Sequence, residues 1–253
     1  MELDQRVALV SGGASGLGRA AVVQFIKDGA RVAVLDADAA SLASLCDSLG
    51  SRALALPADV SKHSEVETAM ATLDKEFGRV DVCLNTVGIG PAGKVVRHGK
   101  ALPLDEFRRV VEVNLIGLFD VMRLCAERMA ANEPGIDNER GVIINVSSIA
   151  ATQGQRGQVA YAASKAGLIG LMLPAARDLA SLGIRVATIT PGPFDTPLAN
   201  SLPENILERV TDLVLYPCRR GDPQEFAALV QHIVENRFLN ATVLSIDAGT
   251  RLI

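Results

Sequence analysis

The amino-acid sequence predicts an α/β fold with a doubly wound, mostly parallel sheet of seven strands and helices on both faces. Short β-branched runs alternate with longer helical patterns along all 253 residues. The strand runs are almost continuously apolar, as in Val142-Ile143-Ile144, which is the composition of strands buried on both faces. No repeat or linker divides the chain, so we expect a single domain over residues 1–253.

Each element is predicted from its apolar periodicity and its flanking residues. Ser61 is the expected N-cap of the third helix, and Glu65 adds a negative charge to its first turn. The resulting order is typical of a Rossmann-like fold. The expected strands are 6–11, 31–36, 52–57, 81–85, 141–147, 184–190 and 242–247, and the expected helices are 15–28, 39–49, 61–77, 104–131, 158–182 and 223–235.

Composition excludes several functional classes. A formal net charge of −4 argues against a nucleic-acid binder, and no apolar run reaches the roughly 18 residues of a membrane span. The amino terminus shows no secretory signal, which favours a cytoplasmic protein. We expect no metal site, because the histidines are scattered and the cysteines form no ligand pairs. The four cysteines, expected to be reduced, are Cys46, Cys83, Cys125 and Cys218.

A glycine-rich segment follows the first strand directly. Glycines at 12, 16 and 18 allow a tight turn, and the next helix directs free N–H groups toward an anion. The segment, Ser11-Gly12-Gly13-Ala14-Ser15-Gly16-Leu17-Gly18, predicts a dinucleotide-binding loop.

Two acidic residues extend this prediction. Asp36 ends the second strand, where a carboxylate accepts hydrogen bonds from ribose hydroxyls and repels the 2′-phosphate of NADP. The prediction is therefore NAD, although Asp36 is also placed to cap the next helix. Asp59 and Val60 follow the third strand, where they would contact adenine, or Asp59 would cap a helix.

Tyr161 and Lys165 lie four residues apart in a predicted helix and therefore share one face. A neighbouring cation stabilises a phenolate, and lowering the pKa of a phenol from about 10 to about 7 takes roughly 4 kcal/mol. Tyr161 would then act as an acid and base on a carbinol or carbonyl. Ser148, at the end of a strand, would hydrogen-bond the substrate oxygen or simply end that strand.

Together these motifs resemble the short-chain dehydrogenase/reductase family over essentially the whole chain. Ser11 stands where the family usually has Thr, and Asn-Thr-Val-Gly at 85–88 replaces Asn-Asn-Ala-Gly, which keeps Asn85 and Gly88. Stretches at 131–134, 140–145, 173–179, 196–204, 219–223 and 235–240 further resemble the branch of the family that acts on 3-hydroxyacyl-CoA and hydroxysteroids.

The resemblance implies a role for each matching residue. Tyr161 would be the general acid and base, Ser148 would orient the substrate, and Lys165 would hold the nicotinamide ribose and lower the pKa of Tyr161. Asn114 would anchor a water molecule that links Lys165 to solvent. The implied cofactor-binding residues are Ser11, Gly12, Ser15, Gly16, Leu17, Gly18, Asp36, Asp59, Val60, Asn85, Thr86, Gly88, Tyr161, Lys165, Pro191, Phe194 and Thr196.

The substrate side is expected near Gln155 and Gln158, which would bind substrate or remain solvated loop residues. Residues 192–221 are expected to form a substrate-side loop, in which 198–216 would be a lid over an acyl chain or steroid, or would pack against the sheet. A basic stretch would attract the phosphates of CoA or stay solvated. Its members are Lys94, Arg97, His98 and Lys100.

The resemblance thus implies an NAD-dependent oxidoreductase that interconverts (S)-3-hydroxyacyl-CoA and 3-oxoacyl-CoA. Alternatives are an NADPH-linked 3-oxoacyl-carrier-protein reductase, a steroid or short-chain alcohol dehydrogenase, and a dinucleotide-binding sensor or scaffold. Asp36 argues against the NADPH-linked reductase, and the intact set of Ser148, Tyr161 and Lys165 argues against the sensor or scaffold. The family also implies a homotetramer formed through the two long helices.

Overall fold

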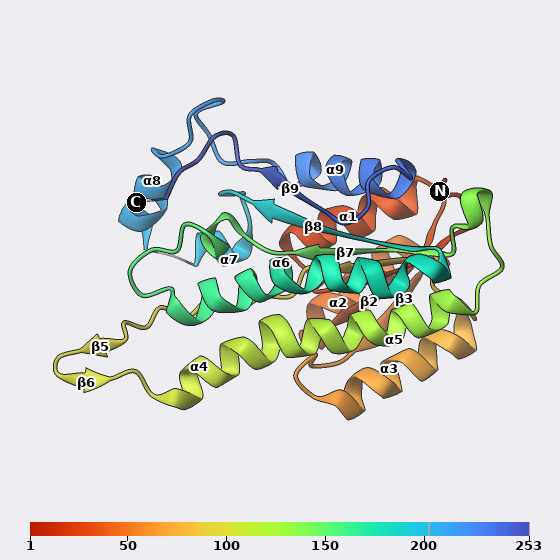
Figure 1. Cartoon of the computed structure of the whole chain (residues 1–253), viewed down its shortest axis with the longest axis horizontal. Coiled ribbons are helices and arrows are strands. Elements are labelled where there is room, and N and C mark those ends of the chain that lie inside the picture. Colours follow the sequence, from red (N-terminus) through yellow and green to blue (C-terminus); the bar gives the residue numbers. More distant parts are fainter. Residues whose placement is uncertain (202, 253) are drawn as a thin grey trace.

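The computed structural model describes residues 1–201 and 203–252, and it contains a seven-stranded sheet between two layers of helices (Figure 1). The strand order is β3-β2-β1-β4-β7-β8-β9, and every pair is parallel. All seven predicted strands are confirmed, with ends that differ by at most one residue. They are β1 (Val7–Ser11), β2 (Arg31–Asp36), β3 (Ala53–Pro57), β4 (Val82–Asn85), β7 (Gly141–Val146), β8 (Ile184–Pro191) and β9 (Thr242–Ile246).

Two apolar cores hold the layers together, one on each face of the sheet. Neighbouring residues of a strand point to opposite faces, so Ala8 and Val10 join one core and Leu9 joins the other. The first core contains α1 (Gly16–Lys27), α2 (Ala39–Leu49) and α9 (Pro223–Glu235). The second contains α3 (His63–Glu76), α5 (Leu118–Ala130) and α6 (Val159–Leu179).

The long helix expected over 104–131 is continuous but not regular. It consists of α4 (Leu104–Val111), a π-helical turn at Glu112–Gly117, and α5. Gly117 permits close approach to the segment after β3, because a Cβ there would lie 2.6 Å from the Val60 carbonyl oxygen. The π-helical turn places Asn114, the residue that the sequence singled out, on the inner side of the helix.

Two short strands and two short helices were not predicted. A hairpin of β5 (Val96–Arg97) and β6 (Lys100–Ala101) lies in the stretch before α4. The helices α7 (Pro197–Asn200) and α8 (Glu204–Thr211) lie in the stretch after β8. Neither stretch contains an expected strand or helix.

The N-cap predicted for α3 is wrong. Lys62 occupies the N-cap position, and it makes no capping hydrogen bond through its side chain. Ser61 instead donates its hydroxyl to Asp59 Oδ1 at 2.7 Å, because the turn after β3 is closed by that carboxylate.

Among the described residues, one segment is long and apolar enough to cross a membrane. It is α6 with the turn that follows it, Val159–Leu182. Length and composition alone are weak evidence, because core helices pass the same test. Here Leu168, Met172 and Ala176 are buried, and α6 forms part of the layer over the sheet (Figure 1). We therefore interpret α6 as a core helix.

Candidate active site

The strand order reverses between β1 and β4, because the chain continues from β1 toward β2 on one side and from β4 toward β7 on the other. In an open parallel sheet, ligands bind outside the carboxyl ends of the strands at such a point. The glycine-rich loop leaves β1 at this position and leads into α1.

The loop is shaped by close contacts that only glycine permits. Gly12 has φ +74°, and a Cβ there would lie 2.8 Å from Thr86 Oγ1; a Cβ on Gly18 would overlap the Gly12 carbonyl oxygen. Thr86 donates its hydroxyl to the carbonyl oxygens of Ser11 (2.6 Å) and Gly12 (3.1 Å). Ser15, the N-cap of α1, makes no capping bond through its side chain. The loop and helix terminus therefore fit a pyrophosphate.

Asp36 supports the loop from β2. Its Oδ2 accepts from the Ala14 backbone N–H and its Oδ1 from that of Asp38, both at 3.0 Å. The helix-capping alternative is wrong for Asp36, since Asp38 caps α2 by accepting from Ser41 N–H at 3.2 Å. A carboxylate has about four lone-pair sites, so Asp36 can still accept from ribose hydroxyls.

Two predicted cofactor contacts are buried structural residues. Ser11 donates its hydroxyl to Asn85 Oδ1, and Asn85 Nδ2 donates to Asn145 Oδ1, each at 2.9 Å. This chain of hydrogen bonds joins the ends of β1, β4 and β7. Asn145 was not among the predicted residues, although a polar residue inside the apolar run of β7 marks it in the sequence.

Beyond β3, Asp59 accepts from the Ser61 backbone N–H at 3.0 Å, in addition to the hydroxyl. Val60 is buried against the core that contains α3 and α5. Asp59 thus closes a turn before α3 without occupying its N-cap, and Val60 lies beside Gly117.

Tyr161 projects from the first turns of α6, and Ser148 follows the end of β7. A hydrogen bond joins the two side chains. Ser148 also accepts from Ala150 N–H at 3.1 Å, which fixes its hydroxyl at the start of a short turn. Burial raises the pKa of Tyr161 above its ordinary value, and the bond with Ser148 opposes this rise.

Lys165 is buried, with 3% of its surface exposed. Its Nζ donates to the carbonyl oxygens of Val146 (2.9 Å) and Val87 (3.4 Å) and lies 5.9 Å from the centre of the Tyr161 ring. Burial lowers the pKa of Lys165 to about 8. The net change for Tyr161 is upward, opposite to the predicted direction, because its burial outweighs the favourable contacts.

Asn114 binds the backbone of Ile89, in the segment after β4 that lies beside Lys165. Its Oδ1 accepts from the Ile89 N–H and its Nδ2 donates to the Ile89 carbonyl oxygen, both at 2.8 Å. Nδ2 also donates to Ser164 Oγ at 3.1 Å. Gly88, next in this segment, is close to Lys165, since a Cβ there would lie 3.1 Å from Nζ. Ser164 was not among the predicted site residues, although it directly precedes Lys165 in the sequence.

The two glutamines lie at the start of α6. Gln158 Oε1 accepts from the Gln155 backbone N–H at 2.9 Å. Both residues are half-buried and lie close in sequence to Tyr161. The side chain of Gln158 thereby closes the turn that leads into the helix.

The segment after β8 returns to the glycine-rich loop. Thr196 caps α7 by accepting from Ala199 N–H at 3.3 Å, and a Cβ on Gly16 would lie 3.4 Å from Thr196 Cβ. Phe194, a predicted cofactor contact, packs its buried ring edge-to-face against Phe226, with ring centres 6.3 Å apart. Pro191 is likewise buried at the end of β8.

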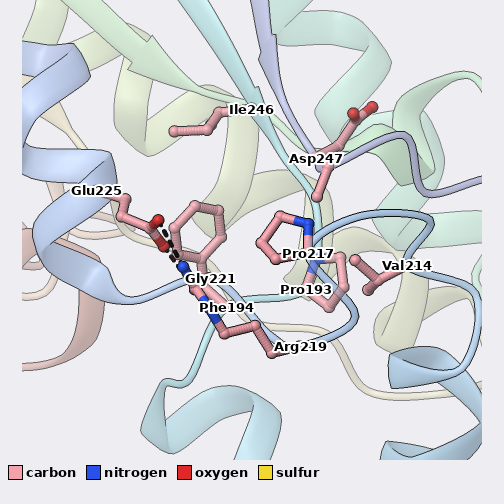
Figure 2. Close-up of a pocket in the computed structure, with 10 residues that line it drawn as sticks. Pro193, Phe194, Val214, Pro217, Arg219, Gly221, Glu225, Ile246 and Asp247 are labelled. Carbon is pink, nitrogen blue, oxygen red and sulfur yellow. Dashed lines mark hydrogen bonds and ion pairs between the residues drawn. The ribbon is translucent and has the colours of Figure 1, made fainter.

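A cavity of about 100 Å³ lies behind this segment (Figure 2). Pro193, Phe194 and Pro217 line it, and Arg219 pairs with Glu225 at 2.8 Å. The Arg219 guanidinium lowers the pKa of Glu225 to about 2. The cavity contains none of the predicted catalytic residues and is distinct from the site around Tyr161.

Comparison with known proteins agrees with this geometry. A family model described as short chain dehydrogenase matches residues 6–207. The chain belongs to the short-chain dehydrogenase family. It is therefore an oxidoreductase that acts on a small-molecule substrate.

Three relatives of this short-chain dehydrogenase are informative. Human 3-hydroxyacyl-CoA dehydrogenase type-2 is 47% identical over 97% of this chain and 95% of its own length. The crystal structure of 3-hydroxyacyl-CoA dehydrogenase type-2 from Mycobacterium avium has a TM-score of 0.93 at 38% identity, covering 98% of this chain and 96% of that one. The 3-ketoacyl-(acyl-carrier-protein) reductase from Brucella melitensis, complexed with NADH, has a TM-score of 0.86 at 28% identity and covers 98% of both chains. The cofactor of this family member is a nicotinamide dinucleotide.

Proposed function

We propose that the chain is an NAD-dependent 3-hydroxyacyl-CoA dehydrogenase, which interconverts (S)-3-hydroxyacyl-CoA and 3-oxoacyl-CoA. The main support is the 47% identity to the human enzyme of that name over 97% of the chain. The hydrogen-bonded Ser148 and Tyr161, with Lys165 beside them, supply the chemistry that this reaction needs.

In the reductive direction, the Ser148 hydroxyl hydrogen-bonds the carbonyl oxygen of the substrate, and Tyr161 donates its phenolic proton to that oxygen. In the oxidative direction, Tyr161 takes the proton back. Burial raises the pKa of Tyr161, so the phenol is protonated at pH 7 and suited to act as an acid. The nicotinamide, when bound, supplies or accepts the hydride.

Lys165 and Asn114 support Tyr161 in different ways. An ammonium group has three donors, and two of those on Lys165 bind backbone carbonyl oxygens, which leaves one for a ribose hydroxyl. Asn114 holds Ile89 in place and so fixes the segment in front of Lys165. We also retain for Asn114 the anchoring of a water molecule that links Lys165 to solvent.

The cofactor is NAD in this proposal. The Asp36 carboxylate would bind the adenosine ribose and repel a 2′-phosphate, and the following Ala37 provides no cation to offset that repulsion. The loop backbone with Ser15 and Leu17 would bind the pyrophosphate, Asp59 and Val60 would contact adenine, and Thr196 would reach the carboxamide or phosphates. Ser11, Asn85 and Thr86 would hold the loop itself.

The substrate would enter between Gln155 and Gln158 and the helices α7 and α8. Leu198 and Ile206 on these helices remain 51% and 37% exposed, which suits a lid that closes over an acyl chain. Leu202, within the predicted lid, lies outside the described residues.

We further propose that the protein is a cytoplasmic homotetramer. The outer faces of α4 and α5 expose Leu104 (59%) and Phe119 (47%), and such apolar side chains favour burial between copies of the chain. All four cysteines are free thiols, as in a reducing compartment.

The test is the oxidation of NADH or NADPH by the purified protein with acetoacetyl-CoA and, separately, with acetoacetyl-acyl-carrier protein. We expect kcat/KM to be at least tenfold higher with NADH than with NADPH, and higher with the CoA thioester. Preference for NADPH and the carrier-protein thioester would establish the reductase function of the Brucella melitensis relative instead.

A further inference from the structure

The hairpin β5–β6 projects beyond the sheet at the end of the molecule where α7 and α8 lie (Figure 1). Its strands are antiparallel, with Arg97 opposite Lys100. His98 (φ +50°) and Gly99 (φ +73°) form its two-residue turn, and two positive φ values in succession are typical of tight hairpins. The Leu102 N–H donates to the Val95 carbonyl oxygen at 2.9 Å and extends the pairing. The basic stretch therefore has a defined structure.

The hairpin concentrates positive charge. Arg97 and Lys100 are direct cross-strand neighbours, so their side chains share one face, and like charges in that position are destabilising. Lys94 and His98 add further basic groups, and all four are exposed. The segment 86–104 contains no acidic residue, although the chain as a whole has a net charge of −4. Among residues 1–201 and 203–252, none of these side chains makes an ion pair or hydrogen bond.

The base of the hairpin is attached to the site around Tyr161. The Gly93 N–H donates to the Gly157 carbonyl oxygen at 2.8 Å, just before α6. Gly90 lies against the Tyr161 ring, since a Cβ there would be 3.4 Å from Cδ2. Arg97 lies seven positions after Gly90, and an extended chain of that length spans at most about 25 Å. The cations thus lie within the reach of one extended ligand that also contacts Tyr161.

We propose that Arg97 and Lys100 bind the phosphate groups of the CoA portion of the substrate while its acyl group lies at Tyr161. This inference rests on the proposed function. CoA carries its phosphates at the end remote from the thioester, and a guanidinium binds phosphate oxygens in pairs. Bound phosphate would also relieve the repulsion between the two opposed cations. Val95 and Val96, 63% and 60% exposed, offer apolar surface to the adenine ring.

The test compares acetoacetyl-CoA with S-acetoacetyl-N-acetylcysteamine, a thioester without phosphates, in NADH-dependent reduction. In the double variant Arg97→Gln/Lys100→Gln, we expect the KM for acetoacetyl-CoA to rise about tenfold with kcat unchanged. Both constants for the cysteamine thioester should stay within twofold. Raising the ionic strength should increase the KM for acetoacetyl-CoA in the wild type and much less in the variant.

The matched control is Lys27→Gln/Lys75→Gln, which removes the same charge from exposed positions on α1 and α3. It should behave as the wild type with both substrates. The charge-conserving Arg97→Lys/Lys100→Arg should restore most of the affinity for acetoacetyl-CoA. Because the hairpin variant removes a repulsion, its Tm should not fall.

The proposal would be overturned if the hairpin variant raised the KM equally for both thioesters, or if the Lys27→Gln/Lys75→Gln control raised the KM for acetoacetyl-CoA as much. An unchanged KM for acetoacetyl-CoA in the hairpin variant would overturn it as well. If neither thioester is turned over, the proposed function fails, and calorimetric titration with CoA then decides the inference separately. Weaker binding of CoA by the hairpin variant than by the control would support the phosphate site, and equal binding would overturn it.

Discussion

Lys165 shows at the scale of one residue how the site is prepared for catalysis. It is 3% exposed and is held by two backbone carbonyl oxygens, without a carboxylate partner among the described residues. Burial of this ammonium lowers its pKa to about 8. A buried lysine that is hydrogen-bonded in place is costly for stability and is therefore best explained by function.

The low pKa of Lys165 predicts how stability depends on pH. Between pH 8 and 10.5 the unfolded chain still holds the lysine proton while the folded protein has released it, so the free energy of unfolding rises with pH. At about 1.4 kcal/mol for each pH unit between the two pKa values, the full effect is on the order of 3 kcal/mol. Urea denaturation of the nucleotide-free protein measures it.

The variant Lys165→Met should lack this rise and should be more stable than the wild type at pH 7. The exposed Lys75→Met serves as the control and should keep the wild-type profile. Parallel profiles for the wild type and Lys165→Met would contradict the account.

The sequence located the polar residues near the site, but it did not show which of them are buried and support the fold. Ser11 and Asn85 have the side chains of ligand contacts, but the structure uses them to join strand ends. Phe194 is one of the expected cofactor contacts, and its ring is part of the core. These roles depend on burial, which arises from packing between residues distant in the sequence.

At the scale of the element, the π-helical turn Glu112–Gly117 is the feature that places Asn114. We expect Asn114→Leu to leave the N–H and carbonyl groups of Ile89 without their partners and to destabilise the protein by about 2 kcal/mol or more. It should also lower kcat, because the segment before Lys165 is released. Urea denaturation and steady-state kinetics with acetoacetyl-CoA check both effects.

Ser164→Ala is the control for Asn114→Leu, because it removes only one of the hydrogen bonds of Asn114. It should cost about 1 kcal/mol and leave kcat close to the wild-type value. Similar kcat values for Asn114→Leu and the wild type would show that the Ile89 contact does not serve the site.

Helices and strands were predictable where their apolar periodicity extends over enough residues. The apolar strands and the helices of ten or more residues satisfy a clear period, and their ends agree closely with the structure. Each strand of the β5–β6 hairpin has only two residues, too few for any alternation to be visible. A π-helical turn changes the hydrogen bonding of a helix without changing its composition, so the sequence showed one uniform helix.

For the molecule as a whole, the proposed homotetramer would bury exposed apolar side chains on α4, α5 and the turn between them. Ile116 and Phe119 are three residues apart, 48% and 47% exposed, and lie on one face of the helix. We expect light scattering to show a mass near four times the 26.6 kDa of one chain. Phe119→Lys should shift this mass downward, because it places a charge in the buried interface.

Phe238→Lys is the matched control for the oligomer. Phe238 is fully exposed and lies outside these helices, between α9 and β9, so this variant should keep the wild-type mass. Unchanged mass in Phe119→Lys would place the interface elsewhere on the molecule.

Proton transfer by Tyr161 is the step on which the proposed reaction of NADH with a 3-oxoacyl-CoA depends. The most direct measurement is the rate of NADH oxidation with acetoacetyl-CoA by the wild type and Tyr161→Phe, together with NADH binding followed by fluorescence. We predict that kcat falls about 10²- to 10⁴-fold in the variant while the Kd for NADH stays within twofold. A variant that keeps the wild-type kcat would contradict the assignment of Tyr161 and the mechanism built on it.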